Sequence, residues 1–406
     1  MEPKALQHNF ELKLVEKTDV TQFNELLRYV FQVTTDDLHT FGWEEEEIRQ
    51  AKLPVLEQAD VIGWYDQTKL ISQIAIYPFT VNIFGQQYAM GGITGVGTYP
   101  EYARMGLMHD LMISALQKMR ENKQFISYLY PYSIPFYRRK GWEIISDKMT
   151  FKVKDTQLPK TKDVLGMVER TDCDDPLIFT IYDNFAAQQH GSMIRTQLAW
   201  DEYWRWESDE MMAAVYRDTT GTPTGFLFYR LADEVFYLKE MVFLNEEARS
   251  GLWNFISAHF SMVNEVQGST YTDEALAFLL DDSEIKETIT PYYMGRIVDL
   301  LPFLQQFPFK TLSKVNGSWC FAVEDPLAEW NRQTYELSLL NGTVTVYVST
   351  KQPTTTVTIQ TLTTMFLGYK RPTYLKKIGR LNATSAEVQL LESIIPADVP
   401  YFSDYF

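Results

Sequence analysis

The stretch TYPEYARMGLMHDLM, residues 98–112, joins residue types that can hold an anion at the start of a helix. Apolar residues recur at helical spacing from Leu107 onward, so we expect the helix to begin beside Gly106. A helix N-terminus offers unpaired backbone N–H groups and the positive end of the helix dipole, which together can bind phosphate. Gly106 permits close approach to the backbone, and Arg104 adds a charge that can pair with a phosphate oxygen.

The residues ahead of this stretch strengthen the interpretation as an anion site. The segment GGITGVGTY, residues 91–99, carries four glycines, consistent with a strand that a ligand approaches closely. A glycine in a first helical turn more commonly has a structural use. The combination of this strand with Pro100, Arg104, Gly106 and an apolar helix instead favours phosphate binding.

A second copy of the motif serves as an internal comparison. NEEARSGLW, residues 245–253, matches PEYARMGLM at five of nine positions, with a constant offset of 145. It keeps Arg249 and Gly251, but the preceding YLKEMVFL has no glycine, Glu247 adds negative charge and Trp253 adds bulk. Because charge and bulk oppose an anion, we predict that this copy keeps the fold and loses the ligand.

The elements that position these motifs follow from the changes of hydrophobic period. A helix is predicted near Asp19, where Asp19 and Gln22 have capping-box spacing. VIGWYD, LISQIAIYPFTVNIF and QYAMGGITGVGTY predict an antiparallel meander leading into the motif helix. The middle third repeats this plan. From Met294 a smaller α+β domain follows, with an Asn-Gly turn at Asn341. We predict an α/β (α+β) chain with domains at 1–155, 156–293 and 294–406.

Composition excludes some classes of protein. A chain of 406 residues exceeds the size of a single core, so two or three domains are expected. A net charge of -16 argues against a nucleic-acid partner; it fits a cationic substrate, or charge that simply maintains solubility. No apolar run approaches the roughly 20 residues of a membrane span, and residues 1–17 lack a signal pattern, which predicts a cytoplasmic protein with no membrane partner. Cys173 and Cys320 are expected to be buried free thiols.

These segments resemble the GNAT N-acetyltransferases, in which a strand-loop-helix motif binds the coenzyme A pyrophosphate on backbone amides. The chain departs from the general pattern at Ala103 and Met108, where the family has Arg or Gln and then Gly or Ala. VGTYPEYARMGLM, PFYRRKGWE, MGRIVDL and the aromatic C-terminus resemble the Eis (enhanced intracellular survival) family more narrowly. That resemblance implies a catalytic GNAT domain with a mixed sheet, a degenerate second GNAT-like domain, and a sterol-carrier-like (SCP2-like) domain.

The resemblance implies acetyl-CoA as co-substrate and no metal. His109 has no second His or Cys at metal-ligand spacing, which agrees with the absence of a metal site. The residues expected to contact acetyl-CoA are Val96, Gly97, Thr98, Arg104, Met105, Gly106, Leu107, Met108 and Ser133.

The resemblance also implies two catalytic groups. Tyr137 would be the general acid toward the coenzyme A sulfur, although by itself it could be a packing residue among 24 tyrosines. The α-carboxylate of Phe406 would be the general base; its unperturbed pKa of about 3.5 keeps it charged at neutral pH. Termini usually fray. PYFSDYF, with four aromatic residues among seven, instead predicts a docked tail.

We therefore expect an acetyl-CoA-dependent N-acetyltransferase that acts by direct attack in a ternary complex. The acceptor would be a primary amine of a cationic small molecule, with aminoglycosides the class that the resemblance implies, and the protein a homo-oligomer, with a hexamer as one form. Asp36, Asp37, Asp404 and the acidic run 44–47 could receive a polycation, or the run could be a solvated helical face. A protein or peptide lysine acetyltransferase and a non-catalytic acyl-CoA or lipid-binding protein stay open as alternatives.

Overall fold

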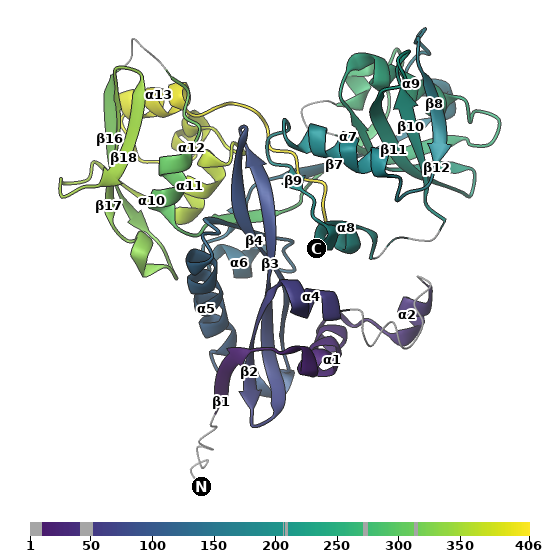
Figure 1. Ribbon diagram of the computed structural model, residues 1–406. Coiled ribbons are helices and arrows are strands. Elements are labelled where there is room, and N and C mark those ends of the chain that lie inside the picture. Colours follow the sequence, from purple (N-terminus) through teal and green to yellow (C-terminus); the bar gives the residue numbers. More distant parts are fainter. Residues whose placement is uncertain (1–9, 41–51, 206, 208–209, 271–274, 312–315) are drawn as a thin grey trace.

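The structure is a computed structural model that describes residues 10–40, 52–205, 207, 210–270, 275–311 and 316–406. Figure 1 shows three bodies, each built from a sheet and the helices packed on it. The acidic run 44–47 lies outside the described residues. In the described ranges no helix combines the length and apolarity needed to cross a bilayer.

The first sheet has eight strands in the order β1-β2-β3-β4-β5-β15-β6, with β9 paired to β3. Its strands are β1 Phe10–Leu14, β2 Asp60–Asp66, β3 Lys69–Ile83, β4 Gln86–Thr98, β5 Ile126–Leu129, β6 Glu143–Ile144, β9 Met193–Ile194 and β15 Met294–Ile297. Strands β2, β3 and β4 pair antiparallel in chain order, which confirms the predicted meander. Strand β4 then pairs with β5 in parallel.

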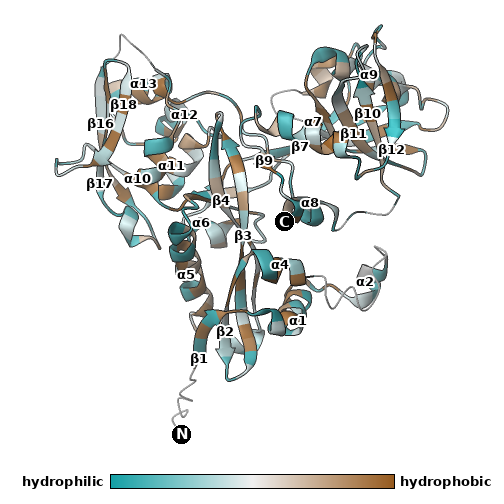
Figure 2. Cartoon of the chain, in the orientation of Figure 1, coloured by the Kyte–Doolittle hydropathy of each residue, from teal (hydrophilic) through white to brown (hydrophobic). Residues whose placement is uncertain are grey.

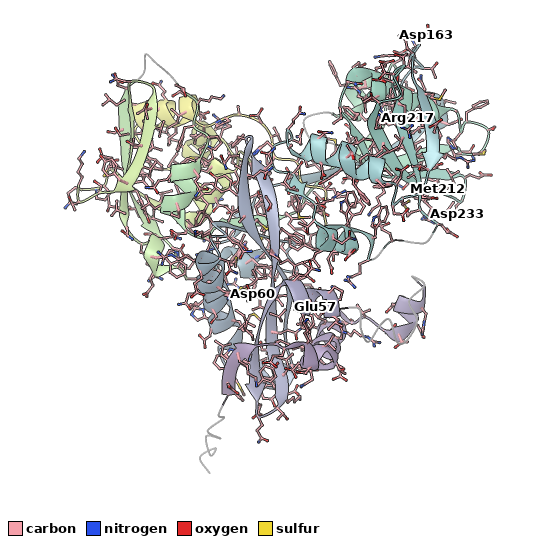
Figure 3. The ribbon with its side chains drawn as sticks, in the orientation of Figure 1. Glu57, Asp60, Asp163, Met212, Arg217 and Asp233 are labelled. Carbon is pink, nitrogen blue, oxygen red and sulfur yellow. The ribbon has the colours of Figure 1, made fainter. Side chains whose placement is uncertain are left out.

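Helices cover both faces of this sheet. The helices of this body are α1 Val20–Phe31, α2 Thr35–Thr40, α4 Leu53–Gln58, α5 Leu107–Glu121 and α6 Ile134–Arg138, of which α2 lies apart from the sheet in Figure 1. Helix α1 buries Phe23 in one core cluster and α5 buries Leu111 in another, so they lie on opposite faces. In Figure 2 both helices carry brown and teal residues together, as expected of amphipathic helices. Asp60 at the start of β2 (Figure 3) accepts a hydrogen bond from Asn122 Nδ2 (2.7 Å), just after α5.

The predicted capping box at α1 is wrong in detail. Asp19 is the N-cap residue, but its side chain accepts no hydrogen bond from the helix backbone. It accepts one from the Tyr65 hydroxyl instead (2.8 Å), while Gln22 Oε1 accepts from the Leu70 N–H. Both polar side chains therefore join the helix to strands β2 and β3.

The second sheet repeats the plan of the first. Its order is β14-β7-β13-β12-β11-β10-β8. The strands are β7 Asp147–Lys154, β8 Met167–Thr171, β10 Met212–Arg217, β11 Pro223–Ala232, β12 Val235–Phe243, β13 Glu265–Thr270 and β14 Lys286–Pro291, with helices α7 Pro176–Ala186, α8 Gln197–Trp204 and α9 Glu246–Ser257. An antiparallel meander β10-β11-β12 is again followed by a parallel pair, β12 with β13, which confirms the predicted second copy.

Strands from one predicted segment join the sheet of another. Strand β7, inside the predicted segment 1–155, inserts between β13 and β14 of the second sheet. Strand β15, inside the predicted segment 294–406, inserts between β5 and β6 of the first sheet. Strand pairing therefore crosses both of the domain boundaries that were predicted from the sequence pattern.

The third body is a four-stranded sheet, ordered β18-β17-β16-β19, with helices packed against it. Its elements are α10 Leu300–Gln306, β16 Gly317–Glu324, β17 Thr334–Leu340, β18 Thr343–Val348, β19 Thr355–Thr358, α11 Ile359–Phe366, α12 Pro372–Lys377 and α13 Ser385–Ile394. Asn341 (φ 50°) and Gly342 (φ 83°) join β17 to β18, which confirms the predicted two-residue turn. The tail after α13, yellow in Figure 1, ends near α8.

Candidate active site

A gap opens in the first sheet where two parallel strands part. Residues 90–92 of β4 pair with residues 126–128 of β5, and the pairing ends there. A β-bulge follows, with Gly95 in the left-handed region (φ 60°), and it bends β4 away. Beyond the gap lies a cavity of about 1040 Å³ lined by residues 93–96 of β4, by α1 and by the segment from Tyr130 to Tyr137. The cavity is large enough for a drug-sized ligand.

The predicted anion loop, residues 104–108, runs into the first turn of α5, which begins at Leu107. Arg104 (φ 64°) and Gly106 (φ 86°) both have left-handed backbones, and Gly106 is the N-cap residue of α5. A Cβ at Gly106 would meet no atom within 4 Å, so the backbone conformation, not space, favours glycine. In the described part of the chain the amides of residues 104–108 have no hydrogen-bond acceptor. These exposed amides fit the requirements of a phosphate.

The predicted acetyl-CoA residues fall into two groups. Val96 and Ser133 line the cavity itself. Gly97 and Thr98 lie further along β4, where they pair with β3, and the Thr98 hydroxyl is 2.6 Å from the Ser72 hydroxyl. Residues 104–106 follow them in sequence at the surface, Met108 is half-buried and Leu107 is buried. Apart from Ser133, the N-cap residue of α6, the predicted residues thus follow one another from the cavity along β4 to the first turn of α5.

Tyr137 lies on α6 and lines the same cavity. Its side chain packs against Phe136 and Trp142, and only 6% of the residue is exposed. Burial raises the pKa of Tyr137 to about 12, so its hydroxyl keeps the proton at neutral pH. No hydrogen bond to this hydroxyl is found among the described residues.

Phe406 reaches the cavity from the far end of the chain. Its ring packs 4.9 Å from the Phe79 ring and 5.3 Å from the Tyr293 ring, and its N–H donates to the Tyr293 hydroxyl (3.1 Å). With 7% of the residue exposed, the tail end is docked against the first sheet rather than frayed.

Sequence reasoning missed a buried charge cluster on the cavity wall. Lys52 Nζ lies 3.1 Å from both carboxylate oxygens of Glu202, and Arg205 Nη2 lies 2.6 Å from one of them. Burial lowers the pKa of Lys52 to about 8. Burial alone would raise the pKa of Glu202, but the positive charges of Lys52 and Arg205 outweigh this effect and lower the pKa of Glu202 to about 2. Lys52 and Glu202 are 150 residues apart, so no local pattern could have revealed the pair.

At the second motif copy, a side chain of the protein itself caps the start of the helix. Asn245 caps α9, because its side chain accepts a hydrogen bond from the Ala248 N–H (2.8 Å). Glu247 accepts from the Leu165 N–H, and Gly251 sits inside the helix against the Tyr216 ring. Trp253 is buried. Of the residues shared with the first copy, Gly251 thus has a packing role here.

Some predicted polar roles need correction. Asp404 was expected to receive a polycation, but it is 1% exposed and its carboxylate lies 2.6 Å from Arg195 Nε, so that role is wrong. Asp37 bonds to the Thr34 hydroxyl and N–H. His109 Nδ1 lies 2.7 Å from Lys140 Nζ. Cys173 and Cys320 are free thiols, but only Cys320 is fully buried.

Comparison with known proteins agrees with this geometry. Residues 11–145 match a family described as an acetyltransferase (GNAT) domain, and residues 191–297 match a second such domain. Residues 300–403 match the sterol carrier protein domain. The chain carries two GNAT acetyltransferase domains. These domains support an acyltransferase enzyme with acetyl-CoA as co-substrate, and the tandem GNAT plus SCP2-like architecture is confirmed.

Two solved structures share the fold over nearly the whole chain, and a curated relative matches part of it. A crystal structure from Enterococcus faecalis, a probable N-acyltransferase of unknown function, is 27% identical with a TM-score of 0.88, covering 98% of this chain and 100% of that one. Eis1 from Mycobacterium abscessus is 16% identical with a TM-score of 0.79 over 98% and 100%, which shows a shared fold. An uncharacterized N-acetyltransferase of Streptomyces griseus is 21% identical over 279 residues, 62% of this chain and 66% of that protein, just under two thirds of its length.

Proposed function

We propose that the first GNAT domain transfers an acetyl group from acetyl-CoA to a primary amine of a small molecule, by direct attack in a ternary complex. The observation that carries this proposal is the cavity of about 1040 Å³, which Val96, Ser133, Tyr137 and Phe406 line together. Residues 93–96 of β4, the strand that leads to the proposed coenzyme A loop, line it on one side. The tail enters it from another.

The proposed chemistry assigns the proton transfers to two catalytic groups. Acetyl-CoA supplies the thioester carbonyl. The Phe406 carboxylate takes a proton from the acceptor ammonium and passes it to solvent, and the freed amine attacks the carbonyl to form the new C–N bond. The nitrogen then loses a second proton to the same carboxylate as the C–S bond breaks. Tyr137 gives its proton to the departing sulfur and regains one from solvent. A hydroxyl with a pKa of about 12 is protonated when the thiolate leaves, which is what a general acid requires.

The acceptor class that the Eis-like architecture suggests is a cationic small molecule, with aminoglycosides as the first candidates. The charge of the cavity favours a second class. Among the described lining residues Glu202 is the acidic side chain, and the basic ones are Arg28, Lys52, Arg139 and Arg205. Coenzyme A phosphates would neutralise some of these charges. An amine that also carries an acidic group, such as an amino acid, would be attracted by the rest.

The deciding experiment measures thiol release from acetyl-CoA with a panel of acceptors. The panel contains aminoglycosides, polyamines, amino acids and lysine peptides, and a no-amine reaction provides the background rate. Amine-dependent release with a small molecule supports the proposal. Release with peptides alone would favour a protein lysine acetyltransferase. No amine-dependent release with any acceptor would favour a non-catalytic acyl-CoA or lipid-binding protein.

The proposed base has its own test. Adding two glycines after Phe406 moves the terminal carboxylate away and should lower kcat by about 100-fold, within the usual range for losing a general base. Affinity for acetyl-CoA, measured by calorimetry, should be unchanged. Wild-type kcat in the extended protein would remove Phe406 as the base. We also propose a cytoplasmic homo-oligomer, and light scattering in solution would measure its mass.

A further inference from the structure

The second GNAT domain has the same gap between parallel strands, but the gap is filled. Residues 235–238 of β12 pair with residues 265–268 of β13, and the pairing ends there. Beyond this point residues 239–241 and residues 269–270 surround a cavity of only about 60 Å³. Residues 400–403 of the C-terminal tail form another wall, and Leu238, Trp253 and three residues of β7, Asp147, Lys148 and Phe151, complete the lining. The tail therefore lies where the first domain has its open cavity.

A fully buried arginine joins the tail to this gap. Arg195 Nε donates to Asp404 Oδ1 (2.6 Å), and its two terminal nitrogens donate to the two oxygens of Glu240, each at 3.0 Å. The Ser403 hydroxyl also donates to Glu240 (2.8 Å). Glu240 lies on β12 at the position that corresponds, by the offset of 145, to Gly95 of β4. An acidic side chain thus replaces the bulge glycine at the equivalent gap.

Aromatic rings exclude water from this arginine. Its guanidinium carbon lies 3.8 Å from the Tyr182 ring centroid, 4.1 Å from Tyr203 and 4.5 Å from Trp200. The Arg195 side chain is 0% exposed, and those of Glu240 and Asp404 are 2% and 1% exposed. Burial raises the pKa of Asp404, while Arg195 opposes that rise. Charges buried this deeply are retained only when they are well paired, which makes the geometry of the tail specific.

The anchored residue lies two positions before the end of the tail. Two residues span at most roughly 7 Å, so fixing Asp404 confines Phe406 to a small volume. The Tyr292 hydroxyl donates to the Asp404 carbonyl (2.9 Å), and the Tyr293 hydroxyl accepts from the Phe406 N–H (3.1 Å). Hydrogen bonds therefore fix the tail at Asp404, beside the second gap, and at Phe406, in the first cavity.

We propose that the cleft of the second GNAT domain has become the receptor for the C-terminal tail, with Arg195 and Glu240 as positioning residues that hold Phe406 in the first domain's cavity. This inference rests on the proposed function, in which Phe406 supplies the general base. In this proposal the degenerate second domain contributes to the reaction of the first domain by positioning the proposed base.

The experiment uses Asp404→Ala in the full chain. Arg195 keeps its pair with Glu240 in this variant, so we expect the second domain to fold. Carboxypeptidase release of Phe406, followed by mass spectrometry, measures how often the tail opens. We expect release to be faster by about 10-fold or more, because cleavage follows the population of the open form. We expect kcat to fall about 10-fold while acetyl-CoA affinity stays within about 2-fold.

A matched control separates tail docking from general stability. Asp325→Asn weakens an equally buried pair with Arg296; both side chains are 0% exposed, and the hydrogen bonds of the pair go to Lys140, Leu327, Ala328 and Asn331 rather than to the tail. It should lower the melting temperature and leave Phe406 protected. If Asp325→Asn releases Phe406 as fast as Asp404→Ala, the inference is overturned. Circular dichroism checks folding, and Arg195→Lys, which keeps the charge and loses the planar fork, should release the tail as well.

The outcomes for the two proposals differ. A protected tail with unchanged kcat in Asp404→Ala overturns the receptor role of the second domain. A released tail with unchanged kcat supports the receptor role and removes Phe406 as the base. A released tail with lower kcat and unchanged acetyl-CoA affinity supports both.

Discussion

The two GNAT domains share a topology and differ at one place, the gap between their central parallel strands. In the first domain a glycine bulge bends β4 outward and about 1040 Å³ stays open. In the second domain Glu240 and the tail leave about 60 Å³. The fold therefore provides the gap in both copies. Side chains within and beyond the sheet decide whether it can accept a ligand.

The helix starts next to the two gaps differ in the same sense. In the first copy the amides of residues 104–108 have no acceptor among the described residues, and Gly106 holds a left-handed backbone. In the second copy the Asn245 side chain satisfies the Ala248 N–H. Two copies with the same Arg and Gly letters thus allow matched substitutions, one at the proposed site and one at a structural position.

The largest expected effect is the loss of the proposed acid. Tyr137→Phe should lower kcat by about 100-fold or more, because the thiolate would leave without a proton donor. Acetyl-CoA affinity should change little. Tyr88→Phe removes another buried hydroxyl, one that donates to the Phe303 carbonyl outside the cavity, and should leave kcat unchanged. Equal losses of kcat in both variants would mean that Tyr137 acts only through packing.

The next effect concerns the junction that supports the filled gap. His190 is 4% exposed. Its Nδ1 accepts a hydrogen bond from the Phe84 N–H (3.1 Å), and its Nε2 lies 3.0 Å from the Leu367 carbonyl oxygen. The His190 carbonyl accepts a hydrogen bond from the Tyr401 N–H of the tail. Burial lowers its pKa from 6.5 to about 4. The unfolded chain therefore binds a proton between pH 6.5 and 4 that the folded chain does not.

The contribution of His190 to the free energy of unfolding should therefore be constant above about pH 6.5. It should fall by about 1.4 kcal/mol per pH unit as the pH drops from 6.5 to 4. At pH 5 the loss is about 2 kcal/mol. Urea unfolding at pH 7 and pH 5 measures it. His190→Gln keeps a neutral side chain and should reduce the difference, whereas His109→Gln at the exposed His109 should not. Identical pH dependence in the wild type and His190→Gln would contradict the assignment.

The comparison also shows which features sequence could predict. The meander, α5 and the second motif copy have local hydrophobic periods and turn residues, and all were predicted correctly. The sequence did not reveal that β7 joins the second sheet and β15 the first, because the alternating pattern of a strand does not specify which sheet it joins.

Buried charges were missed for a related reason. Glu202 and Arg195 each pair with residues more than a hundred positions away, Lys52 and Asp404, so neither pair has a local pattern. Asp404 was named among the acids that could receive a polycation, and only the fold brings Arg195 to it. The Phe406 and Tyr137 assignments came from family resemblance. The structure adds that both side chains line one cavity.

A matched pair of glycine variants tests the helix starts. Gly106→Ala forces an L residue into the left-handed region, which costs about 1–2 kcal/mol, so we expect acetyl-CoA to bind roughly 5- to 10-fold more weakly as the loop relaxes. Gly251→Ala would place a Cβ 2.3 Å from Tyr216 Cε2. It should therefore lower the melting temperature and leave acetyl-CoA affinity unchanged. Calorimetry and thermal unfolding measure both quantities, and the opposite pattern would mean that the second copy binds the ligand.

The smallest expected effect separates the backbone from the side chain at the anion loop. Arg104 is exposed, and an exposed ion pair contributes about 1 kcal/mol or less, so Arg104→Ala should weaken acetyl-CoA binding by at most about 5-fold, and less at high salt. Arg249→Ala, which removes a side chain 3.7 Å from Glu246, should leave that affinity unchanged. A loss for Arg104→Ala larger than that for Gly106→Ala would mean that the side chain, rather than the backbone amides, holds the phosphate. A larger loss for Gly106→Ala than for Arg104→Ala would mean that the backbone amides hold the phosphate. That is the expected result, because both motif copies have the arginine, whereas the amides without an acceptor are found in the first copy.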